Sequence, residues 1–202
     1  MKTWLAGCLA LLLSINVFAD SDPKAIVEAL KIARDEFYQD VSKSQSGLLS
    51  EDDLFGRVSK RMVPLINFEK IALRVMGKHR KIASTAEQER FIGVLTNSAL
   101  NAYIKGLGGY EGEKLEIPDQ AVLISPKRAV LDCVLNRPAG EALPVQFSLG
   151  MTQSNNWLIE NVTIAGVNLG LLLRDQFNSL VQSTGSVSGA IDAWSFESVS
   201  AN

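Results

Sequence analysis

The sequence predicts a single α+β domain in which N-terminal helices pack on one face of a C-terminal antiparallel sheet. The first observation behind this is a change of hydrophobic period. Apolar residues recur every three or four positions up to Tyr103 and every second position after Tyr110. The second is the length, because 202 residues without a repeat or linker suit one domain. The third is a pair of turn signals, at 138–140 and 153–155, which separate the alternating segments of a meander.

The first 19 residues have the pattern of a secretory signal peptide. Lys2 gives a short positive start, and residues 4–14 form an apolar run that is too short to span a bilayer. Val17 and Ala19 place small residues at the −3 and −1 positions of a cleavage site. We therefore expect export and cleavage after Ala19, which leaves a soluble protein.

A rival interpretation starts from residues 5–8, LAGC, which match a bacterial lipoprotein box. That box lies so close to Lys2 that almost no apolar segment precedes it, so we favour the later cleavage. The domain then comprises residues 20–202 and keeps one cysteine, Cys133. An exported protein with one thiol has no internal disulfide, and its hydrophobic core must hold it together.

The charge balance excludes several classes of partner. Lys and Arg number 20 and Asp and Glu number 22, which gives a formal net charge of −2 at pH 7. Nucleic-acid-binding domains carry a basic excess because the phosphate backbone dominates their affinity. Strong binding to an anionic membrane surface also requires clustered positive charge. We expect neither kind of partner.

Helical signals fill the first half of the chain. A helix begins at Asp22–Pro23, where the aspartate caps and the proline occupies the first turn. Its apolar face consists of Ile26, Leu30, Ala33, Phe37 and Val41. A second helix is expected over 50–62, before Pro64, and a third over 68–76, ending at Gly77.

A longer helix follows two overlapping capping boxes. Ser84 pairs with Glu87, and Thr85 pairs with Gln88, at the three-residue spacing that lets side chains bond the free N–H groups of the first turn. The helix is expected to end in the glycine-rich segment 106–109. Because those glycines follow a helix instead of opening one, they do not form a phosphate-binding loop.

Strand signals fill the second half. A short strand at 115–117 ends at Pro118, and two longer segments then alternate apolar and polar residues. Their apolar positions are Ala129, Leu131, Cys133 and Leu135 in one segment, and Leu143, Val145, Phe147, Leu149 and Met151 in the other. A further strand from Trp157 leads through a tight Ala165–Gly166 turn to Asn168, which caps a leucine-rich helix. One short helix is expected around 190–196.

The sequence offers little chemistry. His79 is the only histidine, and its basic neighbours favour a solvated surface position. Cys133 lies on the apolar side of a strand, which favours a buried thiol over a reactive one. The chain has no cluster with metal-ligand spacing and no nucleophile–base pair. We expect no enzyme activity, no cofactor and no metal.

Two motifs resemble those of the MlaC (toluene-tolerance) family. The first is FEKIALRVMG at 68–77, followed by ASTAEQERF at 83–91. The second comprises Trp157, NV at 161–162 and GVNL at 166–169, followed by Arg174 and Phe177. The resemblance covers about residues 55–181. The sequence departs from the family pattern at Asn168, where serine is usual and the cap is kept, and at Arg80, where many members carry an aromatic residue.

This resemblance implies a function and a fold. Members of the family are periplasmic phospholipid carriers that shuttle lipid between an outer-membrane lipoprotein–porin complex and an inner-membrane ABC transporter with an MCE subunit. Their fold is NTF2-like, with an apolar pocket between the helices and the sheet. We therefore expect a periplasmic phospholipid carrier that contributes to outer-membrane lipid asymmetry in the Mla pathway. The alternative is a periplasmic chaperone or protein-interaction module that shields hydrophobic segments.

The expected lipid-binding residues are the large apolar side chains of the helical and strand faces. They are Phe68, Ile71, Val75, Phe91, Leu95, Tyr103, Leu131, Val145, Phe147, Leu149, Trp157, Ile159, Val162, Ile164, Val167, Leu169, Leu172, Leu173 and Phe177. Arg174 is expected to contact a phosphate headgroup or an acidic partner at the pocket mouth, because its planar guanidinium suits both. Two acyl chains would require a pocket on the order of 1,000 Å³.

Overall fold

The computed structural model describes residues 22–107 and 110–196, so the predicted signal peptide and its cleavage site lie outside the described residues. The helices are α1 (Lys24–Gln45), α2 (Glu51–Met62), α3 (Phe68–Val75), α4 (Thr85–Leu107), α5 (Leu169–Thr184) and α6 (Val187–Asp192), with short 3₁₀ helices η1 (Val63–Leu65) and η2 (Gly77–Lys81). The strands are β1 (Lys114–Glu116), β2 (Val122–Ser125), β3 (Arg128–Asn136), β4 (Leu143–Met151), β5 (Trp157–Ile164) and β6 (Val167–Asn168). The predicted α+β class is confirmed. The C-terminal helix α6 begins three residues before the predicted 190–196 segment and ends within it, at Asp192.

The six strands form one antiparallel sheet in the order β1-β3-β4-β5-β6, and β2 pairs with the other end of the β3 edge. Leu131 of β3 lies opposite Phe147 of β4, and Phe147 lies opposite Val162 of β5. The alternating apolar positions therefore share one face, as predicted. The sequence did not predict β2, because VLIS at 122–125 does not alternate apolar and polar residues; in the structure all four residues are exposed.

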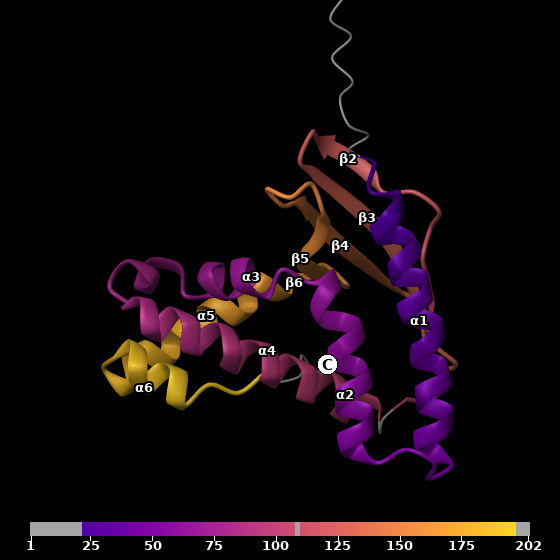
Figure 1. The fold of residues 1–202 in the computed structure, drawn as a ribbon, viewed down its shortest axis with the longest axis horizontal. Coiled ribbons are helices and arrows are strands. Elements are labelled where there is room, and N and C mark those ends of the chain that lie inside the picture. The colour runs from indigo at the N-terminus through magenta and orange to yellow at the C-terminus, as the bar shows by residue number, and fades with distance from the viewer. Residues whose placement is uncertain (1–21, 108–109, 197–202) are drawn as a thin grey trace, which may run out of the picture.

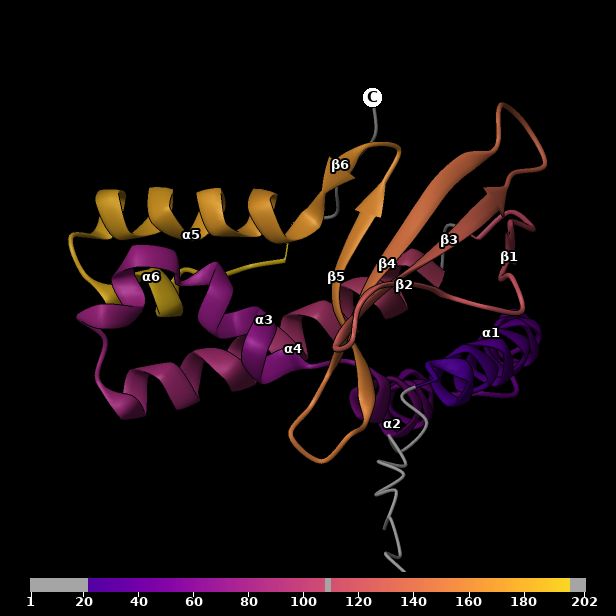
Figure 2. The ribbon, with the colours of Figure 1, turned by 90° about the horizontal axis from the view of Figure 1, so that it is seen from above.

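The helices do not form one continuous layer on the sheet. Figures 1 and 2 show α1 beside β3 and β4, whereas α3, α4, α5 and α6 group together next to β5 and β6. The core is accordingly divided. Among the helices, α1 alone supplies fully buried residues to the cluster on the sheet, through Ile26, Val27 and Leu30. A second cluster joins α3 to α6, and a third joins α1, α2 and α4.

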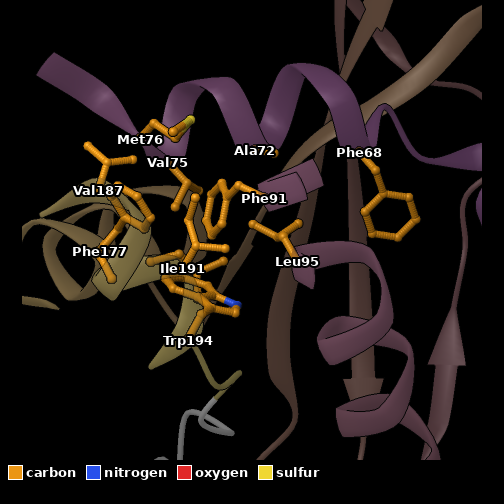
Figure 3. Packing of buried hydrophobic residues seen from close by; sticks show 12 residues of the cluster. Phe68, Ala72, Val75, Met76, Phe91, Leu95, Phe177, Val187, Ile191 and Trp194 are labelled. Atoms are coloured by element: carbon orange, nitrogen blue, oxygen red, sulfur yellow. The ribbon is translucent and has the colours of Figure 1, made fainter. Parts of the chain in front are cut away.

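The cluster between α3, α4, α5 and α6 is built around aromatic rings. Figure 3 shows Phe91, Phe177, Ile191 and Trp194 turned toward one another, with Phe68 at the other end of α3. The ring centroids of Phe91 and Phe177 lie 4.6 Å apart, and Phe91 meets Trp194 edge-on at 5.1 Å. Such pairs stabilise a core beyond the area they bury. This group of helices therefore has a core of its own, independent of the sheet.

One of the two predicted capping boxes forms at the start of α4. The Glu87 N–H donates to Ser84 Oγ at 3.2 Å, and the Ser84 N–H donates to Glu87 Oε2 at 2.8 Å. These bonds to the ionised form lower the pKa of Glu87. The second predicted box is wrong, because the side-chain Nε2 of Gln88 instead donates to the main-chain oxygens of Arg80 and Ala83. The helix therefore begins at Thr85, one residue after the cap.

The predicted turn and cap between β5 and α5 are confirmed. Ala165 and Gly166 both have positive φ, 49° and 83°, the conformation that a two-residue hairpin turn requires. Asn168 Oδ1 accepts from the N–H of Leu171 at 3.1 Å and begins α5. The turn holds β6 against β5, so that α5 starts beside the sheet.

A bulge in β5 anchors α3 to the sheet. Leu149 faces Ile159 and Ser148 faces Asn161, so Glu160 is the extra residue between the two registers. The side chain of Glu160 is buried, and its carboxylate pairs with Lys70 and Arg74 of α3; the Arg74 Nη2 to Glu160 Oε2 distance is 3.0 Å. The absence of a side chain at Gly150 makes room for this carboxylate, because a Cβ there would lie 2.0 Å from Glu160 Oε1.

We expect Gly150→Ala to lower the free energy of unfolding by about 1–3 kcal/mol, because the added methyl displaces the buried carboxylate from its two cations. Urea denaturation would measure the loss. The matched control is Gly93→Ala in α4, where a Cβ meets nothing within 4 Å. That change should stabilise the helix by about 1 kcal/mol. Equal stabilities for Gly150→Ala and the parent would contradict the steric argument.

Candidate functional site

An apolar cavity of about 580 Å³ lies between the sheet and the helices α1, α4 and α5. The inner face of β4 and β5 forms one wall, and α1 and α4 form the opposite walls. The end of α2, the start of α3 and the start of α5 complete the enclosure. The volume falls within the range of ligand cavities in proteins. It is smaller than the roughly 1,000 Å³ expected for two acyl chains.

Four aromatic rings take up space at one end of the cavity. Phe37 and Tyr38 of α1 meet Tyr103 of α4 and the following Tyr110, and all four line the cavity. The Phe37 centroid lies 5.4 Å from that of Tyr103 and 5.7 Å from that of Tyr110. Burial raises the pKa of the Tyr103 hydroxyl, so this side chain is neutral at physiological pH.

The cavity brings together many of the residues that the sequence predicted as lipid-binding. Those that line it are Phe68, Ile71, Leu95, Tyr103, Val145, Phe147, Ile159, Val162, Ile164, Leu169 and Leu173. They come from α3, α4, the two central strands and α5. The predicted face of the Leu143–Met151 strand therefore points into the cavity at Val145 and Phe147.

The other predicted residues do not line the cavity. Val75, Phe91 and Phe177 are buried in the core between α3 and α6. Leu131, Leu149 and Trp157 are buried between the sheet and α1. Val167 and Leu172 are exposed on the outer surface. An apolar residue at the right period can face either a cavity or a close-packed core, because both exclude water, and periodicity does not distinguish them.

The sequence did not predict the lining that comes from α1 and from the chain after α4, nor three further lining residues at the end of α2, before α3 and in α4. The missed residues are Leu30, Ala33, Arg34, Phe37, Tyr38, Met62, Ile66, Ala99, Tyr110, Glu113, Leu115, Ile117, Leu135, Asn161, Gly170 and Phe196. The apolar face of the first helix was a usable signal, since Leu30, Ala33 and Phe37 belong to it.

Phe196 reaches the cavity from the far end of the chain. Trp194, two residues earlier, is buried between the helices, and its Nε1–H donates to Ser98 Oγ of α4 at 3.0 Å. The Gln176 side chain of α5 donates to the main-chain oxygen of Ser195 at 2.7 Å. These two bonds direct Phe196 toward the cavity, where it lies among residues of α4 and α5. No local sequence pattern indicates that Phe196 lines the cavity, because its position depends on these tertiary contacts.

Two charged residues, Arg34 and Glu113, are among the cavity-lining residues that the structure describes. Both Nε and Nη2 of Arg34 lie 2.8 Å from Asp35 Oδ1, and Nη1 lies 3.5 Å from the main-chain oxygen of Leu115. The hydrogen bond to Asp35 raises the pKa of Arg34, so the guanidinium stays charged. Glu113 Oε2 accepts from the N–H of Glu111 at 2.9 Å. The polar groups therefore gather where α1 meets the segment before β1.

His79 and Cys133 are both buried. The prediction of a solvated surface histidine is wrong, because the ring packs edge-on against Phe177 and Nε2 lies 2.9 Å from Asn178 Oδ1 of α5. Cys133 is buried in the sheet core as predicted, and burial raises the pKa of its thiol to about 12. In residues 22–107 and 110–196 there is no group of three or more potential metal ligands.

Arg174 lies outside the cavity, on the outer side of α5. Its aliphatic stem passes over Gly77, where a Cβ would lie 3.3 Å from Cγ and Cδ of the arginine. Its guanidinium is half exposed, and Nε lies 3.9 Å from Asp175 Oδ1. The exposed cations Lys78 and Arg80 of η2 are on the neighbouring segment. The geometry thus places Arg174 at a surface away from the cavity lining.

Comparison with known proteins agrees with this architecture. The toluene tolerance protein ttg2D of Pseudomonas putida is 26% identical over 165 residues, which cover 80% of this chain and 76% of that protein. The intermembrane phospholipid transport system binding protein MlaC of Haemophilus influenzae is 21% identical over 115 residues, 56% of this chain and 52% of that protein.

A solved structure shares the fold. The phospholipid-binding protein of Ralstonia solanacearum, determined in complex with a phospholipid, superposes with a TM-score of 0.70 at 17% identity and covers 85% of this chain and 93% of its own. No described helix is both long and apolar enough to cross a membrane. The family model described as MlaC protein matches residues 33–195. The chain therefore belongs to the MlaC family.

Proposed function

We propose that this protein is a periplasmic phospholipid carrier that moves lipid between the outer and inner membranes. The observation that carries the proposal is the apolar cavity of about 580 Å³ between the sheet and the helices. Family membership and the phospholipid bound to the Ralstonia protein, which has the same fold, support it. The proposed ligand is a phospholipid whose acyl chains lie in the cavity.

A lipid needs an apolar cavity to cross an aqueous space, because exposing its acyl chains to water costs free energy. Each methylene removed from water contributes about 0.8 kcal/mol, so a chain of sixteen carbons does not cross an aqueous space unprotected. A cavity walled by side chains such as Phe147, Val162 and Leu173 provides an apolar environment for it. The headgroup can stay at the cavity edge, so the protein need not bury an isolated charge. Carrying a lipid in this way requires no catalytic group.

Native mass spectrometry of the purified protein tests the proposal. We expect adducts of phospholipid mass that disappear after delipidation and return on incubation with phospholipid vesicles. The alternative, a chaperone or protein-interaction module, predicts bare protein or peptide adducts. Bare protein that takes up no lipid from vesicles would reject the carrier function. The same measurement on protein from the periplasm would give the mass of the mature chain, which we expect to begin at Asp20.

The proposed carrier also docks on partner complexes. The expected partners are an inner-membrane ABC transporter with an MCE subunit and an outer-membrane lipoprotein–porin complex. Lys78, Arg80 and Lys81 of η2 are exposed, and no carboxylate lies within ion-pair distance of them in the described part of the chain. Together with Arg174 they form a basic patch at the contact of η2 and α5, which suits an acidic surface on a partner.

We expect Arg174→Ala to slow lipid exchange with a partner complex or with anionic liposomes, and to leave the lipid content and the melting temperature nearly unchanged. The reason is that its half-exposed guanidinium contributes little to stability, since exposed pairs contribute at most about 1 kcal/mol. Lipid transfer kinetics would measure the effect. Arg128→Ala, an exposed arginine on β3, is the control. A large fall in melting temperature with normal exchange would make Arg174 a structural residue.

A further inference from the structure

The polar groups that line the cavity are concentrated at the end formed by α1 and the segment before β1. Tyr38 Oη accepts from the N–H of Leu115 at 2.7 Å, and Arg34 Nη1 lies 3.5 Å from the main-chain oxygen of the same residue. Tyr110 Oη donates to the main-chain oxygen of Glu113 at 2.9 Å. The Tyr38 and Tyr110 rings are 6.1 Å apart. One small region of the lining therefore holds a cation, a carboxylate and two phenols, and Lys114 Nζ lies beside it, 5.0 Å from the centroid of the Tyr38 ring.

The opposite end of the cavity is apolar. Leu169, Leu173 and Phe196 line it. Asn161 is the polar side chain that lines the cavity there, and its Oδ1 already accepts from the N–H of Gly170 at 2.9 Å. A ligand charge at this end would find no opposite charge among the lining residues. The cavity thus has a polar end and an apolar end, which orients an amphipathic ligand.

Arg34 keeps hydrogen-bonding capacity for a ligand. A guanidinium carries five N–H donors. The contacts to Asp35 engage one donor on Nε and one on Nη2, and the contact from Nη1 to Leu115 is at the long limit of a hydrogen bond. The Arg34 side chain is 23% exposed, so it is held in place and still accessible. Its remaining donors fit a phosphate oxygen, which charge-assisted bonds favour.

Glu113 complements this cation. Oε2 accepts one main-chain N–H, from Glu111. In the described structure Glu113 has no cation within ion-pair distance, although it lines the cavity. A carboxylate in that position attracts a positive group and repels a net negative one. An ammonium near it can also lie against the ring of Tyr110 through a cation–π interaction, whereas Lys114 Nζ already lies over the Tyr38 ring, 5.0 Å from its centroid.

We propose that Arg34 and Glu113 form a headgroup subsite for a zwitterionic phospholipid, with the phosphate at Arg34 and the ammonium at Glu113. This inference rests on the proposed carrier function and adds a preference among lipids. Phosphoethanolamine and phosphocholine headgroups share the required pair of charges. A phosphoglycerol headgroup has the phosphate but no cation, so Glu113 disfavours it.

A competition experiment with delipidated protein tests the subsite. Vesicles contain equal amounts of phosphatidylethanolamine, phosphatidylcholine and phosphatidylglycerol with the same acyl chains, and native mass spectrometry counts the lipids bound. We expect the parent protein to favour the zwitterionic lipids over phosphatidylglycerol. Glu113→Gln should reduce that preference about fivefold, the upper range for a partly exposed ion pair. Arg34→Gln should weaken uptake of all three lipids, because each contains a phosphate.

Matched controls separate the subsite from general effects of charge. Arg128→Gln and Glu141→Gln make the same changes at exposed positions that do not line the cavity, and both should keep the parent preference. If Arg34→Gln does not fold, Arg34→Lys replaces it. That variant should keep uptake but lose part of the affinity, since lysine cannot form the planar two-point contact.

The possible outcomes distinguish the headgroup subsite from the carrier function. A preference for either zwitterionic lipid, or for both, that Glu113→Gln diminishes supports the subsite, and the two zwitterionic arms identify the ammonium it takes. Uptake of all three lipids in vesicle proportions, or a preference for phosphatidylglycerol, overturns it and leaves the carrier function standing. Equal changes in the control variants also overturn it. No uptake of any lipid by the parent rejects the carrier function itself.

Discussion

Phe147→Asp should remove nearly all bound phospholipid from the folded protein. Phe147 lies in the centre of β4, opposite Leu131 and Val162, and its ring lines the cavity. A carboxylate at this position would lie among apolar walls and acyl chains without a cation. Burying an unpaired charge costs several kcal/mol in practice, unless the group takes up a proton. Lipid extracted per mole of folded protein, measured by mass spectrometry, would record the loss.

The control places the same charge on the other face of the sheet. Val134→Asp in β3 changes an apolar residue to aspartate at a position that is 39% exposed and faces away from the cavity. It should retain normal lipid. Circular dichroism would establish that both variants are folded. A folded Phe147→Asp protein with the lipid content of Val134→Asp would show that this face of β4 is not a wall of the ligand site.

Phe91→Ala is expected to have the largest effect on stability, lowering the free energy of unfolding by about 3–5 kcal/mol. Phe91 is fully buried, and its ring contacts those of Phe177 and Trp194 in the core between α3 and α6. Truncation would leave a cavity that close-packed neighbours fill only in part. Urea denaturation monitored by tryptophan fluorescence would measure the loss.

The same variant separates a core residue from a wall residue. Because Phe91 does not line the cavity, the folded fraction of Phe91→Ala at low temperature should carry the parent amount of lipid. Ile82→Ala, at an apolar position that is 74% exposed, should change the stability by less than about 0.5 kcal/mol. A Phe91→Ala protein of normal stability that has lost its lipid would reverse the assignment and place Phe91 at the ligand.

The sequence was sufficient to predict the features that depend on interactions between residues close together in the chain. The Ser84 capping box, the Ala165–Gly166 turn and the Asn168 cap each depend on contacts within a few positions, and all three form. The alternation in β3 and β4 also identified the buried face of the sheet, because successive residues in a strand point to opposite sides. These local rules, together with the change of period, are enough for the α+β class.

The division between core and cavity required the tertiary structure. Phe68 and Phe91 are both large, apolar and on the predicted faces of helices, yet Phe68 lines the cavity and Phe91 lies in close-packed core. Which of the two faces the cavity depends on how far α3 and α4 each lie from the sheet. That distance is set by the sum of contacts across the fold, including the Glu160 carboxylate that holds α3 to the bulge of β5.

The sequence by itself determined the fold class, the elements that caps and turns delimit, and, through two motifs, the family. Only the tertiary structure decided that the first helix supplies a wall of the cavity, that Phe196 reaches it from the C-terminal end, and that Arg34 and Glu113, 79 positions apart, share its polar end. The physical reason is that hydrophobic burial is non-directional. A sequence pattern therefore indicates which residues avoid water, whereas the packing of distant segments decides whether protein or ligand covers them.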